Sequence, residues 1–432
     1  MSKKKIVYIG LAADILHEGH INILKTASKL GTVIVGLLTD TAIASYKKLP
    51  FLNFNQRKIV LENIKHVDRI IPQKTLDYVE NLKIIKPDYV VHGDDWKEGI
   101  QKKTRQRVIN TLKLWGGRLI EPRYTKNISS TKIRSKIFSL GITPQNRLSK
   151  LSRLLKVKKI VRILETHNSL TGLIVENLNY VKNSQSIEFD GMWSSSLTDS
   201  LTKGKPDNQS VDYSTRILGL NDIMDVTTKP LIFDADNGGR IEHVPYLVKT
   251  LERIGVSAMV MEDKIGEKTN SLFEDQKKTK QDSIKNFCKK LKIAKNSKIS
   301  EDFFIIARVE SFILGKSLND ALSRAINYVK AGADGILIHS KEKNPKQIFE
   351  FAKKFQKTKY FCPLVAVPST YSKVRERELI KKGFKVVIYA NHMLRAAYPS
   401  MLNIGRSILK NGRSFEIEKK ITPIKEIISL IK

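Results

Sequence analysis

Short apolar runs alternate with amphipathic helical stretches along the whole chain. In the first part, the apolar runs are bounded by polar or turn-forming residues, as is typical of buried strands. These runs are Ile6–Ile9, Thr32–Leu38, Arg69–Ile71, Asp88–Val91 and Arg118–Ile120. Helical patterns such as Gln56–Ile64 lie between them. Strand and helix in alternation predict an α/β fold with a Rossmann-like, doubly wound parallel sheet.

The rest of the chain repeats this alternation. The predicted strands are Ile163–Glu165, Ile187–Trp193, Leu231–Phe233, Ala258–Met261, Phe304–Ala307, Gly335–Ile338, Leu364–Val367 and Val386–Tyr389. Eight strands separated by helical patterns predict a (β/α)8 TIM barrel. The turn-forming stretch Gly141–Asn146 separates the two parts, so we expect domains at 1–140 and 141–432. Arg147–Lys159 indicates a basic amphipathic helix docked on the barrel, with a membrane-surface role as the alternative.

The formal net charge of +34, from 77 Lys and Arg against 43 Asp and Glu, raises the question of a nucleic-acid partner. The excess is mostly lysine and is spread along the chain, with no arginine-rich arm. We therefore expect no nucleic-acid partner, and nucleic-acid binding stays as the alternative to an anionic small-molecule substrate. No stretch is long and apolar enough to cross a bilayer. Cys288 and Cys362 lie far apart, which favours a reducing cytoplasm and no disulfide framework.

Polar side chains follow successive strands of the predicted barrel. They are Trp193–Leu197, Asp234, Asp236, Glu262, Arg308, His339, Pro368 and Asn391. Any one of these residues by itself is more often structural than functional. Because the carboxyl ends of all eight strands meet at one rim, and active sites of TIM barrels lie there, the set as a whole indicates an active site.

The residue types at this rim suggest the chemistry. Asp234, Asp236 and Glu262 offer the hard oxygen atoms that Mg²⁺ prefers. Arg308 and His339 are suited to holding a phosphoryl or phosphonyl group. The small residues Ser194–Ser196 can offer backbone N–H groups to a carboxylate.

A charged loop follows Glu262. It carries Lys264, Lys268, Asn270 and Ser271 around Gly266. Taken alone, such a stretch is usually a solvated turn. Beside a strand-end carboxylate, it predicts a lid over a metal-bound anionic substrate.

The second domain resembles phosphoenolpyruvate mutase of the isocitrate lyase superfamily. The resemblance rests on the motifs Trp-x-Ser-x-Leu from Trp193, Asp-Ala-Asp from Asp234 and Glu-Asp-Lys-x-x-x-Lys-x-Asn-Ser from Glu262. It implies conversion of phosphoenolpyruvate to phosphonopyruvate with Mg²⁺. Lyase members carry a catalytic cysteine in the loop, and this loop has none, which counts against C–C cleavage. A phosphonopyruvate hydrolase shares nearly all these residues and remains the alternative.

By the same resemblance, Asp234 ligates the metal directly, and Asp236 and Glu262 do so mainly through water. Asp207 lies against the migrating phosphoryl group. The implied catalytic residues of this domain are Asp207, Lys268, Asn270, Arg308 and His339, and the implied substrate-binding residues are Trp193, Ser195, Ser196, Leu197 and Ser271. The resemblance also implies a homo-oligomer, a dimer or a tetramer.

In the first domain, the chemistry centres on His17-Glu-Gly-His20 between a strand and a helix. A helix N-terminus favours an anion, the glycine admits a phosphate, and imidazoles can donate hydrogen bonds as charge builds in phosphoryl transfer. Metal ligation and a surface position are the alternatives for a pair of histidines alone. Two further segments, Val91–Trp96 and Ile128–Arg134, strengthen the first interpretation.

These segments together resemble the cytidylyltransferases that act on glycerol 3-phosphate and phosphocholine. The resemblance implies that His17 and His20 contact the phosphates of CTP during catalysis. It also implies a nucleotide-binding set, which consists of Asp14, Lys48, Asp94, Trp96, Ser129, Thr131 and Arg134. The chain departs from the family at Ala12–Ala13, where Thr-Phe is usual.

Taken as a whole, the sequence resembles fusions of a cytidylyltransferase with a phosphoenolpyruvate mutase in phosphonate biosynthesis. The paired-histidine type of first domain is the one seen with 2-hydroxyethylphosphonate as the CMP acceptor. We therefore expect that acceptor, with 2-aminoethylphosphonate as the alternative.

Overall fold

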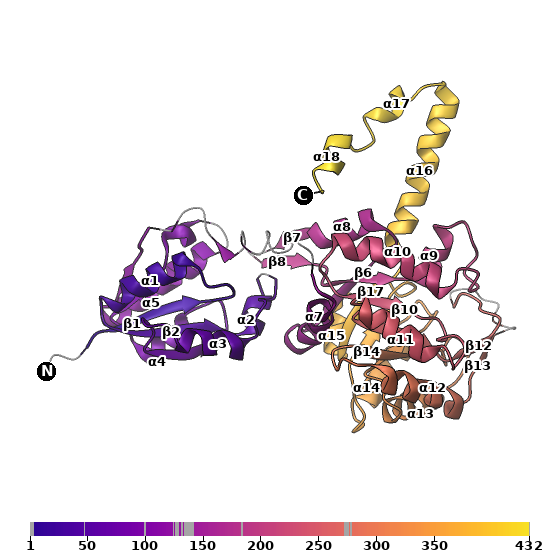
Figure 1. Cartoon of the computed structure of the whole chain (residues 1–432), viewed down its shortest axis with the longest axis horizontal. Coiled ribbons are helices and arrows are strands. Elements are labelled where there is room, and N and C mark those ends of the chain that lie inside the picture. Colours follow the sequence, from indigo (N-terminus) through magenta and orange to yellow (C-terminus); the bar gives the residue numbers. More distant parts are fainter. Residues whose placement is uncertain are drawn as a thin grey trace. The chain divides into compact units, whose positions relative to one another are not determined.

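The computed structural model describes residues 4–46, 48–98, 101–123, 125, 129–130, 133, 142–182, 185–271, 276 and 279–431. The chain divides into two compact units (Figure 1). Unit 1 is Met1–Leu140 with Asn179–Ile187, and unit 2 is Gly141–Leu178 with Glu188–Lys432.

Unit 1 is built on a five-stranded parallel sheet in the order β3-β2-β1-β4-β5. Its strands are β1 (Ile6–Leu11), β2 (Thr32–Leu38), β3 (Arg69–Gln73), β4 (Tyr89–Val91) and β5 (Arg118–Ile120). Its helices are α1 (Glu18–Ser28), α2 (Asp40–Ala44), α3 (Phe54–Glu62), α4 (Val79–Ile85) and α5 (Lys102–Leu112). The strand order reverses between β1 and β4, which is where such sheets bind ligands.

Both faces of this sheet are covered, as the doubly wound prediction requires. Val7 and Ile9 of β1 belong to one buried apolar cluster, with Leu24 of α1. Tyr8, between them in sequence, belongs to the cluster on the other face with Leu82 of α4. Because side chains alternate along a strand, a central strand with two covered faces is apolar at every position. The predicted fold class of this part is confirmed.

Unit 2 contains a closed parallel barrel in the order β6-β9-β10-β11-β14-β15-β16-β17, in which β17 pairs with β6. The strands are β6 (Val161–Glu165), β9 (Gly191–Ser194), β10 (Leu231–Asp234), β11 (Ala258–Glu262), β14 (Phe304–Val309), β15 (Gly335–Ile338), β16 (Leu364–Ala366) and β17 (Phe384–Tyr389). The predicted TIM barrel is confirmed.

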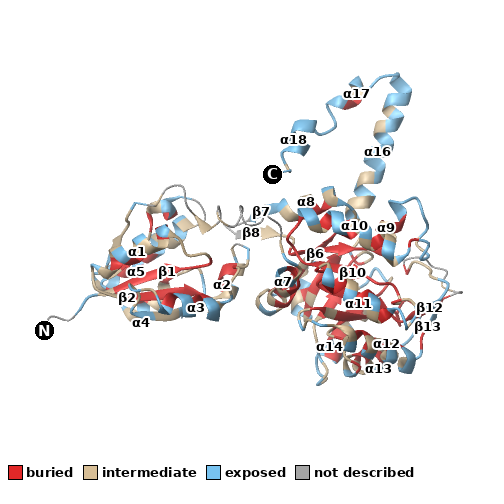
Figure 2. Ribbon diagram, viewed as in Figure 1, coloured by how far each residue is buried: buried red, intermediate tan, exposed pale blue. Residues whose placement is uncertain are grey.

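Unit 2 also contains a series of helices. The helices are α7 (Pro144–Val157), α8 (Ser169–Asn177), α9 (Ser196–Leu201), α10 (Tyr213–Val226), α11 (Val244–Arg253), α12 (Ile284–Ser297), α13 (Leu318–Lys330), α14 (Lys346–Phe355), α15 (Glu376–Lys381), α16 (His392–Asn411), α17 (Phe415–Glu418) and α18 (Ile424–Ile428). A small sheet in this unit pairs β12 (Lys264–Gly266) with β13 (Thr279–Gln281). A second small sheet pairs β7 (Asn179–Lys182) with β8 (Gln185–Glu188), and all of it except Glu188 belongs to unit 1. In Figure 2 the barrel strands are largely buried, whereas the helices carry buried, intermediate and exposed residues.

One predicted strand is divided in the structure. The run Ile187–Trp193 covers the end of β8 and most of β9, with Asp190 between them. The buried Asp190 carboxylate accepts hydrogen bonds from Arg162 N (2.9 Å) and Lys158 Nζ. This carboxylate ties the residue before β9 to the start of β6, so the apolar run cannot continue as one strand.

Helix α7 packs on the barrel, as its sequence predicts. Leu148, Leu151 and Leu154 are buried, and Leu155 is half-buried. Arg147 is also buried and donates hydrogen bonds to the carbonyl oxygens of Met224 (2.9 Å) and Lys229 (2.9 Å). The guanidinium therefore satisfies backbone acceptors on the neighbouring chain segment.

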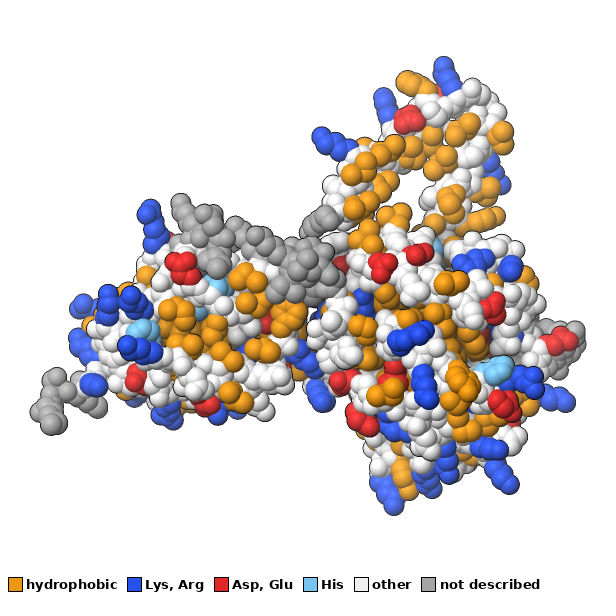
Figure 3. Space-filling model, viewed as in Figure 1, with side chains coloured by type: hydrophobic (Ala, Val, Ile, Leu, Met, Phe, Trp, Pro, Cys, Tyr) orange, Lys and Arg blue, Asp and Glu red, His pale blue; other side chains and the backbone are white. Residues whose placement is uncertain are grey.

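The last helices leave the barrel as an arm, α16–α18 (Figure 1). Helix α16 is described over its whole length, and none of its residues is buried. The arm exposes many apolar side chains, which gather along it in Figure 3. Among the described residues, the structure contains no helix that is both long and apolar enough to span a membrane.

Candidate active sites

The barrel has a cavity of about 70 Å³ at the carboxyl ends of its strands. All the predicted site residues of the second domain line it. They are Trp193, Ser195, Ser196, Leu197, Asp207, Asp234, Asp236, Glu262, Lys268, Asn270, Ser271, Arg308 and His339. Strand ends supply most of them, and the loop between β12 and β13 supplies Lys268, Asn270 and Ser271.

Three carboxylates form the base of this cavity, and all are nearly inaccessible to solvent. Burial alone would raise the pKa of Asp234, but Arg308, Lys268 and Arg216 outweigh burial and lower it. Burial and the charge of Asp234 raise the pKa of Asp236. Burial raises the pKa of Glu262 to about 7. The three groups are thus held in different electrostatic environments within one site.

The turn after Asp234 and the start of α9 hold the Asp234 carboxylate in place through hydrogen bonds. Asp236 has a left-handed backbone, with φ of 47°, and its N–H donates to Oδ1 of Asp234 at 3.2 Å. Ser196 Oγ, at the start of α9, donates to Oδ2 of Asp234 at 3.1 Å. A non-glycine residue at positive φ is uncommon and is found where the surroundings enforce it.

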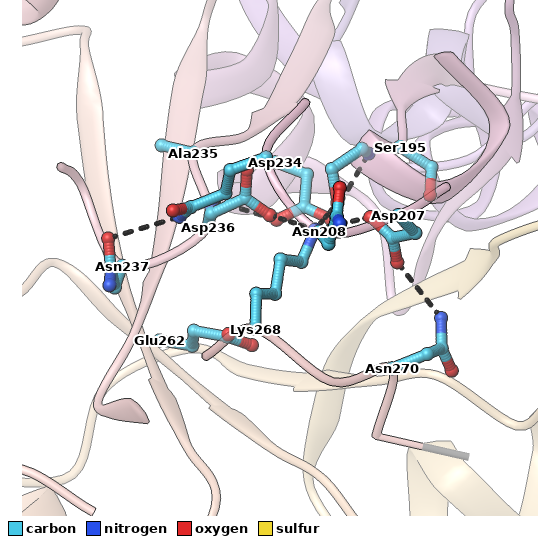
Figure 4. Close-up of polar contacts among 12 residues, drawn as sticks. Ser195, Asp207, Asn208, Asp234, Ala235, Asp236, Asn237, Glu262, Lys268 and Asn270 are labelled. Carbon is cyan, nitrogen blue, oxygen red and sulfur yellow. Dashed lines mark hydrogen bonds and ion pairs between the residues drawn. The ribbon is translucent and has the colours of Figure 1, made fainter. Parts of the chain in front are cut away.

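Lys268 reaches from the loop into the middle of the carboxylates (Figure 4). Its Nζ lies 2.5 Å from Oδ1 of Asp236 and also forms an ion pair with Asp207. It donates a further hydrogen bond to Ser196 Oγ at 2.8 Å. Burial would lower the pKa of Lys268, but Asp236, Asp234 and Asp207 raise it above its ordinary value. The ammonium group is therefore fully charged and ties the loop to the barrel.

The opposite side of the cavity presents cations and amides. Arg308 Nη2 donates to Ser271 Oγ at 2.8 Å and lies 3.3 Å from Oε2 of Glu262. His339 Nδ1 lies 3.0 Å from Arg308 Nη2. Burial and Arg308 lower the pKa of His339. Asn270 Nδ2 donates to Oδ2 of Asp207 at 3.1 Å. This wall offers several N–H groups to an anionic ligand.

The carboxylates fit a hard divalent cation by their chemistry. Among the described residues, no group of three His, Cys, Asp or Glu side chains is arranged to hold a metal ion unaided. Lys268 and Arg308 lie against Asp236 and Glu262 instead. Mg²⁺ needs few direct protein ligands and keeps several waters, so an oxygen-only set with one direct ligand suffices for it.

The structure adds residues that the predicted set omits. Lys264 lines the cavity, and Glu310 lies just behind it. Asn391, a rim residue in the sequence pattern, also lines the cavity. In the described part of the chain, Asn391 Oδ1 and Trp193 Nε1 are buried without a hydrogen-bond partner. Unpaired buried polar groups are costly, so these two atoms are available to a ligand.

Unit 1 has its own cavity of about 470 Å³ at the carboxyl end of β1. Among the residues that line it are His17, His20 and Ser129 of the predicted set. The two imidazole rings lie 4.0 Å apart between centroids. His17 caps α1, because its Nδ1 accepts a hydrogen bond from Gly19 N at 3.1 Å. Burial lowers the pKa of His17, so this ring is neutral at neutral pH.

Other predicted nucleotide-binding residues lie elsewhere. The Asp14 carboxylate accepts a hydrogen bond from Phe51 N at 2.5 Å and lines a separate hollow. Asp95 lines the main cavity, whereas its neighbour Asp94 and Lys48 are not among the lining residues. Thr131 and Arg134 lie outside the described residues.

Trp96 is buried behind the cavity rather than on its wall. The 3₁₀ turn Asp94–Lys97 places its ring against that of His92, with centroids 3.8 Å apart. Its Nε1 donates to Oε1 of Glu121 at 2.7 Å. His92 therefore forms the surface that sequence reasoning assigns to Trp96.

A closed parallel barrel with a charged rim, together with a doubly wound sheet with paired histidines at a helix N-terminus, defines an enzyme with two sites. Residues 151–409 match the phosphoenolpyruvate phosphomutase family, and residues 8–136 match the cytidylyltransferase-like family. The phosphoenolpyruvate phosphomutase of Tetrahymena pyriformis is 35% identical over 286 residues, which are 66% of this chain and 91% of that protein.

Two further relatives cover the two parts. The crystal structure of a phosphonopyruvate hydrolase with oxalate and Mg²⁺ has a TM-score of 0.59 and 31% identity, and the match covers 67% of this chain and 95% of that one. The glycerol-3-phosphate cytidylyltransferase of Bacillus subtilis is 32% identical over 139 residues, which are 32% of this chain and 99% of that protein. The chain belongs to the phosphoenolpyruvate phosphomutase family and carries a cytidylyltransferase-like domain at its N-terminal end.

Proposed function

We propose that the barrel interconverts phosphoenolpyruvate and 3-phosphonopyruvate with Mg²⁺. This proposal rests on the contacts of Asp207. Its carboxylate forms an ion pair with Lys268 and accepts a hydrogen bond from Asn270, directly beside the other carboxylates. Asp234 would be the direct metal ligand, and Asp236 and Glu262 would act through water. The bound cation would hold the substrate oxygens and offset their negative charge.

The protein groups then account for the transfer. The P–O bond of phosphoenolpyruvate breaks, and its electron pair stays with the oxygen of the pyruvate enolate. The phosphoryl group, metaphosphate-like at this stage, is held by Arg308, His339 and Asn270. Carbon 3 of the enolate then donates an electron pair to phosphorus and forms the P–C bond. Backbone N–H groups around Ser195 and Ser196 would hold the carboxylate in place between the two steps.

Exclusion of water separates a mutase from a hydrolase at this site. Water that reached the phosphoryl group would give pyruvate and phosphate. Lys268 closes the loop on the barrel through three contacts, to Asp207, Asp236 and Ser196. This closure supports a mutase.

The test is ³¹P NMR of the full-length protein with Mg²⁺ and phosphonopyruvate. We expect the phosphonate resonance to be replaced by that of phosphoenolpyruvate. Accumulation of inorganic phosphate and pyruvate would show the hydrolase instead.

We also propose that unit 1 transfers CMP from CTP to 2-hydroxyethylphosphonate and releases pyrophosphate. A phosphonate oxygen would attack the α-phosphorus of CTP, while His17 and His20 donate hydrogen bonds to its phosphates. The cavity of about 470 Å³ is large enough for a nucleotide site. Asp95 on its wall is a carboxylate that could pair with an amine, which makes 2-aminoethylphosphonate the second candidate. A pyrophosphate-release assay with CTP, Mg²⁺ and each phosphonate in turn decides between them.

We infer, finally, that the protein is a homo-oligomer, a dimer or a tetramer. The arm α16–α18 exposes apolar side chains that a monomer would leave in water. These include Tyr398, Met401, Leu409, Phe415, Ile424, Ile428 and Ile431. Exposed apolar surface of this extent marks an interaction site. Light scattering of the full-length protein, compared with a Leu409→Glu, Ile424→Glu variant, tests this assignment.

A further inference from the structure

Glu310 joins four residues of the barrel cavity without lining the cavity itself. It follows β14 and is completely buried. Its Oε1 accepts a hydrogen bond from Arg308 Nε and lies 3.0 Å from His339 Nδ1. Its Oε2 accepts a hydrogen bond from Ser271 Oγ at 2.7 Å and lies 3.6 Å from Lys264 Nζ.

These partners belong to two parts of the site. Arg308 and His339 are on the barrel, at or just beyond the ends of β14 and β15. Lys264 starts β12, and Ser271 lies in the loop that β12 leads into. Lys264 Nζ and Arg308 Nη2 both donate to Ser271 Oγ, at 2.6 and 2.8 Å, and the same hydroxyl donates to Glu310. One carboxylate therefore connects the loop to the barrel wall.

The charge of Glu310 suits this position. Burial would raise its pKa, but Arg308 and His339 outweigh burial and hold the pKa well below its ordinary range. An ionised carboxylate accepts on both oxygens and donates nothing, so it can hold several N–H and O–H groups together. His339 Nδ1 is engaged by Glu310 and Arg308, which leaves Nε2 as the ring nitrogen for a ligand in the cavity.

We propose that Glu310 is a positioning residue that sets the phosphoryl-binding wall, Arg308 and His339, and aligns the closed loop with that wall through Ser271. This inference rests on the proposed mutase function, because the phosphoryl group is what this wall would hold. Glu310 itself does not touch the substrate. It acts through the residues that do.

The substitution Glu310→Gln removes the charge and keeps the size. A glutamine amide has one acceptor oxygen, and its NH₂ group can only donate. It can therefore serve either the Arg308 side or the Ser271 side, whereas the carboxylate serves both. We expect the wall and the loop to lose their mutual alignment while the barrel stays folded.

A matched control is Glu252→Gln. Glu252 is also buried in the barrel unit, and its carboxylate accepts hydrogen bonds from Ile299 N and Ser300 N. Within the described part of the chain, its side-chain hydrogen bonds are to these backbone groups and not to a cavity residue. Its substitution reports the cost of replacing a buried glutamate away from the site.

The experiment uses the full-length protein with Mg²⁺ and phosphonopyruvate, and oxalate as a second probe that has no phosphoryl group. For Glu310→Gln we expect kcat/KM to fall by about a hundredfold, the scale of a small misplacement in an active site. We also expect a larger share of turnover to end as pyruvate and phosphate, since the loop closes less exactly. Inhibition by oxalate should change by less than about threefold, because the residues proposed to bind the carboxylate and the metal are unchanged.

The outcomes separate the inference from the function it rests on. If the wild-type protein converts phosphonopyruvate to pyruvate and phosphate, the mutase proposal is wrong. The role of Glu310 is then tested only by comparing the effect of the substitution on phosphonopyruvate turnover with its effect on oxalate inhibition. Equal losses for both probes, or a Glu310→Gln variant that matches Glu252→Gln, would show a merely structural role and overturn the inference. Circular dichroism and thermal unfolding confirm that both variants are folded.

Discussion

The side chains of Lys268 and Asp236 meet at 2.5 Å, between Nζ and Oδ1, although one lies on the loop after β12 and the other follows β10. The same ammonium group pairs with Asp207, which lies on a third segment. A single cation thus holds three segments of the chain at the mouth of the barrel. The contact makes the loop part of the active site and not merely its cover.

The first prediction concerns this cation. Lys268→Met keeps the length of the side chain and removes its charge, so Asp207 and Asp236 lose their common partner. We expect mutase turnover to fall by at least about a hundredfold, as when one charge-stabilising donor is removed from an active site. The measurement is the rate of phosphoenolpyruvate formation from phosphonopyruvate. Lys280→Met, an exposed substitution on β13, is the control and should retain turnover. Near-normal turnover in Lys268→Met would refute the role of this cation.

The second prediction concerns the metal. Asp234→Asn leaves the shape of the base of the cavity but removes the charge of the proposed direct ligand. We expect Mg²⁺ affinity to fall by at least about tenfold and turnover to fall with it, since oxygen-ligand charge sets affinity for hard cations. Titration calorimetry with Mg²⁺ or Mn²⁺ measures the affinity apart from activity. Asp212→Asn, which only alters the cap of α10, should bind the metal normally. Unchanged affinity in Asp234→Asn would remove Asp234 from the metal set.

The third prediction concerns the independence of the two sites. His20→Ala and His17→Asn should each lower CMP transfer by about a hundredfold or more, the usual contribution of a positioned proton donor or acceptor. Asparagine is chosen at position 17 because it is a good N-cap, which preserves the start of α1. Pyrophosphate release measures the first activity and ³¹P NMR the second. Turnover of phosphonopyruvate should stay within about twofold of wild type. Loss of both activities together would show that the sites are coupled.

The fourth prediction concerns the two cysteines. Burial raises the pKa of Cys362 to about 12 and also raises the pKa of Cys288. Both thiols therefore ionise at higher pH than an ordinary thiol, so iodoacetamide at pH 8.5 should label the native protein slowly and the unfolded protein fully. We expect no loss of mutase turnover during the slow labelling, since neither cysteine lines the cavity. Rapid labelling with inactivation would point to a thiol in the reaction.

The raised pKa of Cys362 also affects the pH dependence of the stability of the protein. The folded protein holds the proton of Cys362 more tightly than the unfolded chain does, so ionisation favours unfolding. The contribution of this thiol is complete below about pH 9 and is lost as the pH rises from about 9 toward 12. Replacement by serine should flatten the pH dependence of the unfolding midpoint in that window.

The hydrophobic pattern alone determined the fold of both parts. β1 is apolar at every position because both faces of its sheet are covered, and the barrel strands are apolar because helices surround them. Each site motif lies next to a strand in sequence, namely the motif from Trp193, the Asp234–Asp236 pair and the loop after Glu262. Since all parallel strands of a barrel end at one rim, local patterns were enough to bring these groups into one cavity.

Other features depended on contacts between residues far apart in sequence. Trp96 stacks behind His92, and Asp14 accepts a hydrogen bond from Phe51 N, because one turn and one loop fold back on the sheet. The run Ile187–Trp193 is divided between two strands where the Asp190 carboxylate accepts a hydrogen bond from Arg162 N. Local sequence preference carries no information about such partners.

Glu310 shows the same limit most clearly. In sequence it is one charged residue after an apolar strand, two positions from Arg308, and a solvated surface glutamate would look the same. Its function depends on Ser271 and His339, which approach it only when the loop closes and the barrel forms. The sequence determined which groups stand at the rim. The tertiary structure decided which of them form hydrogen bonds or ion pairs with one another, because these interactions act over a few ångströms in space and not along the chain.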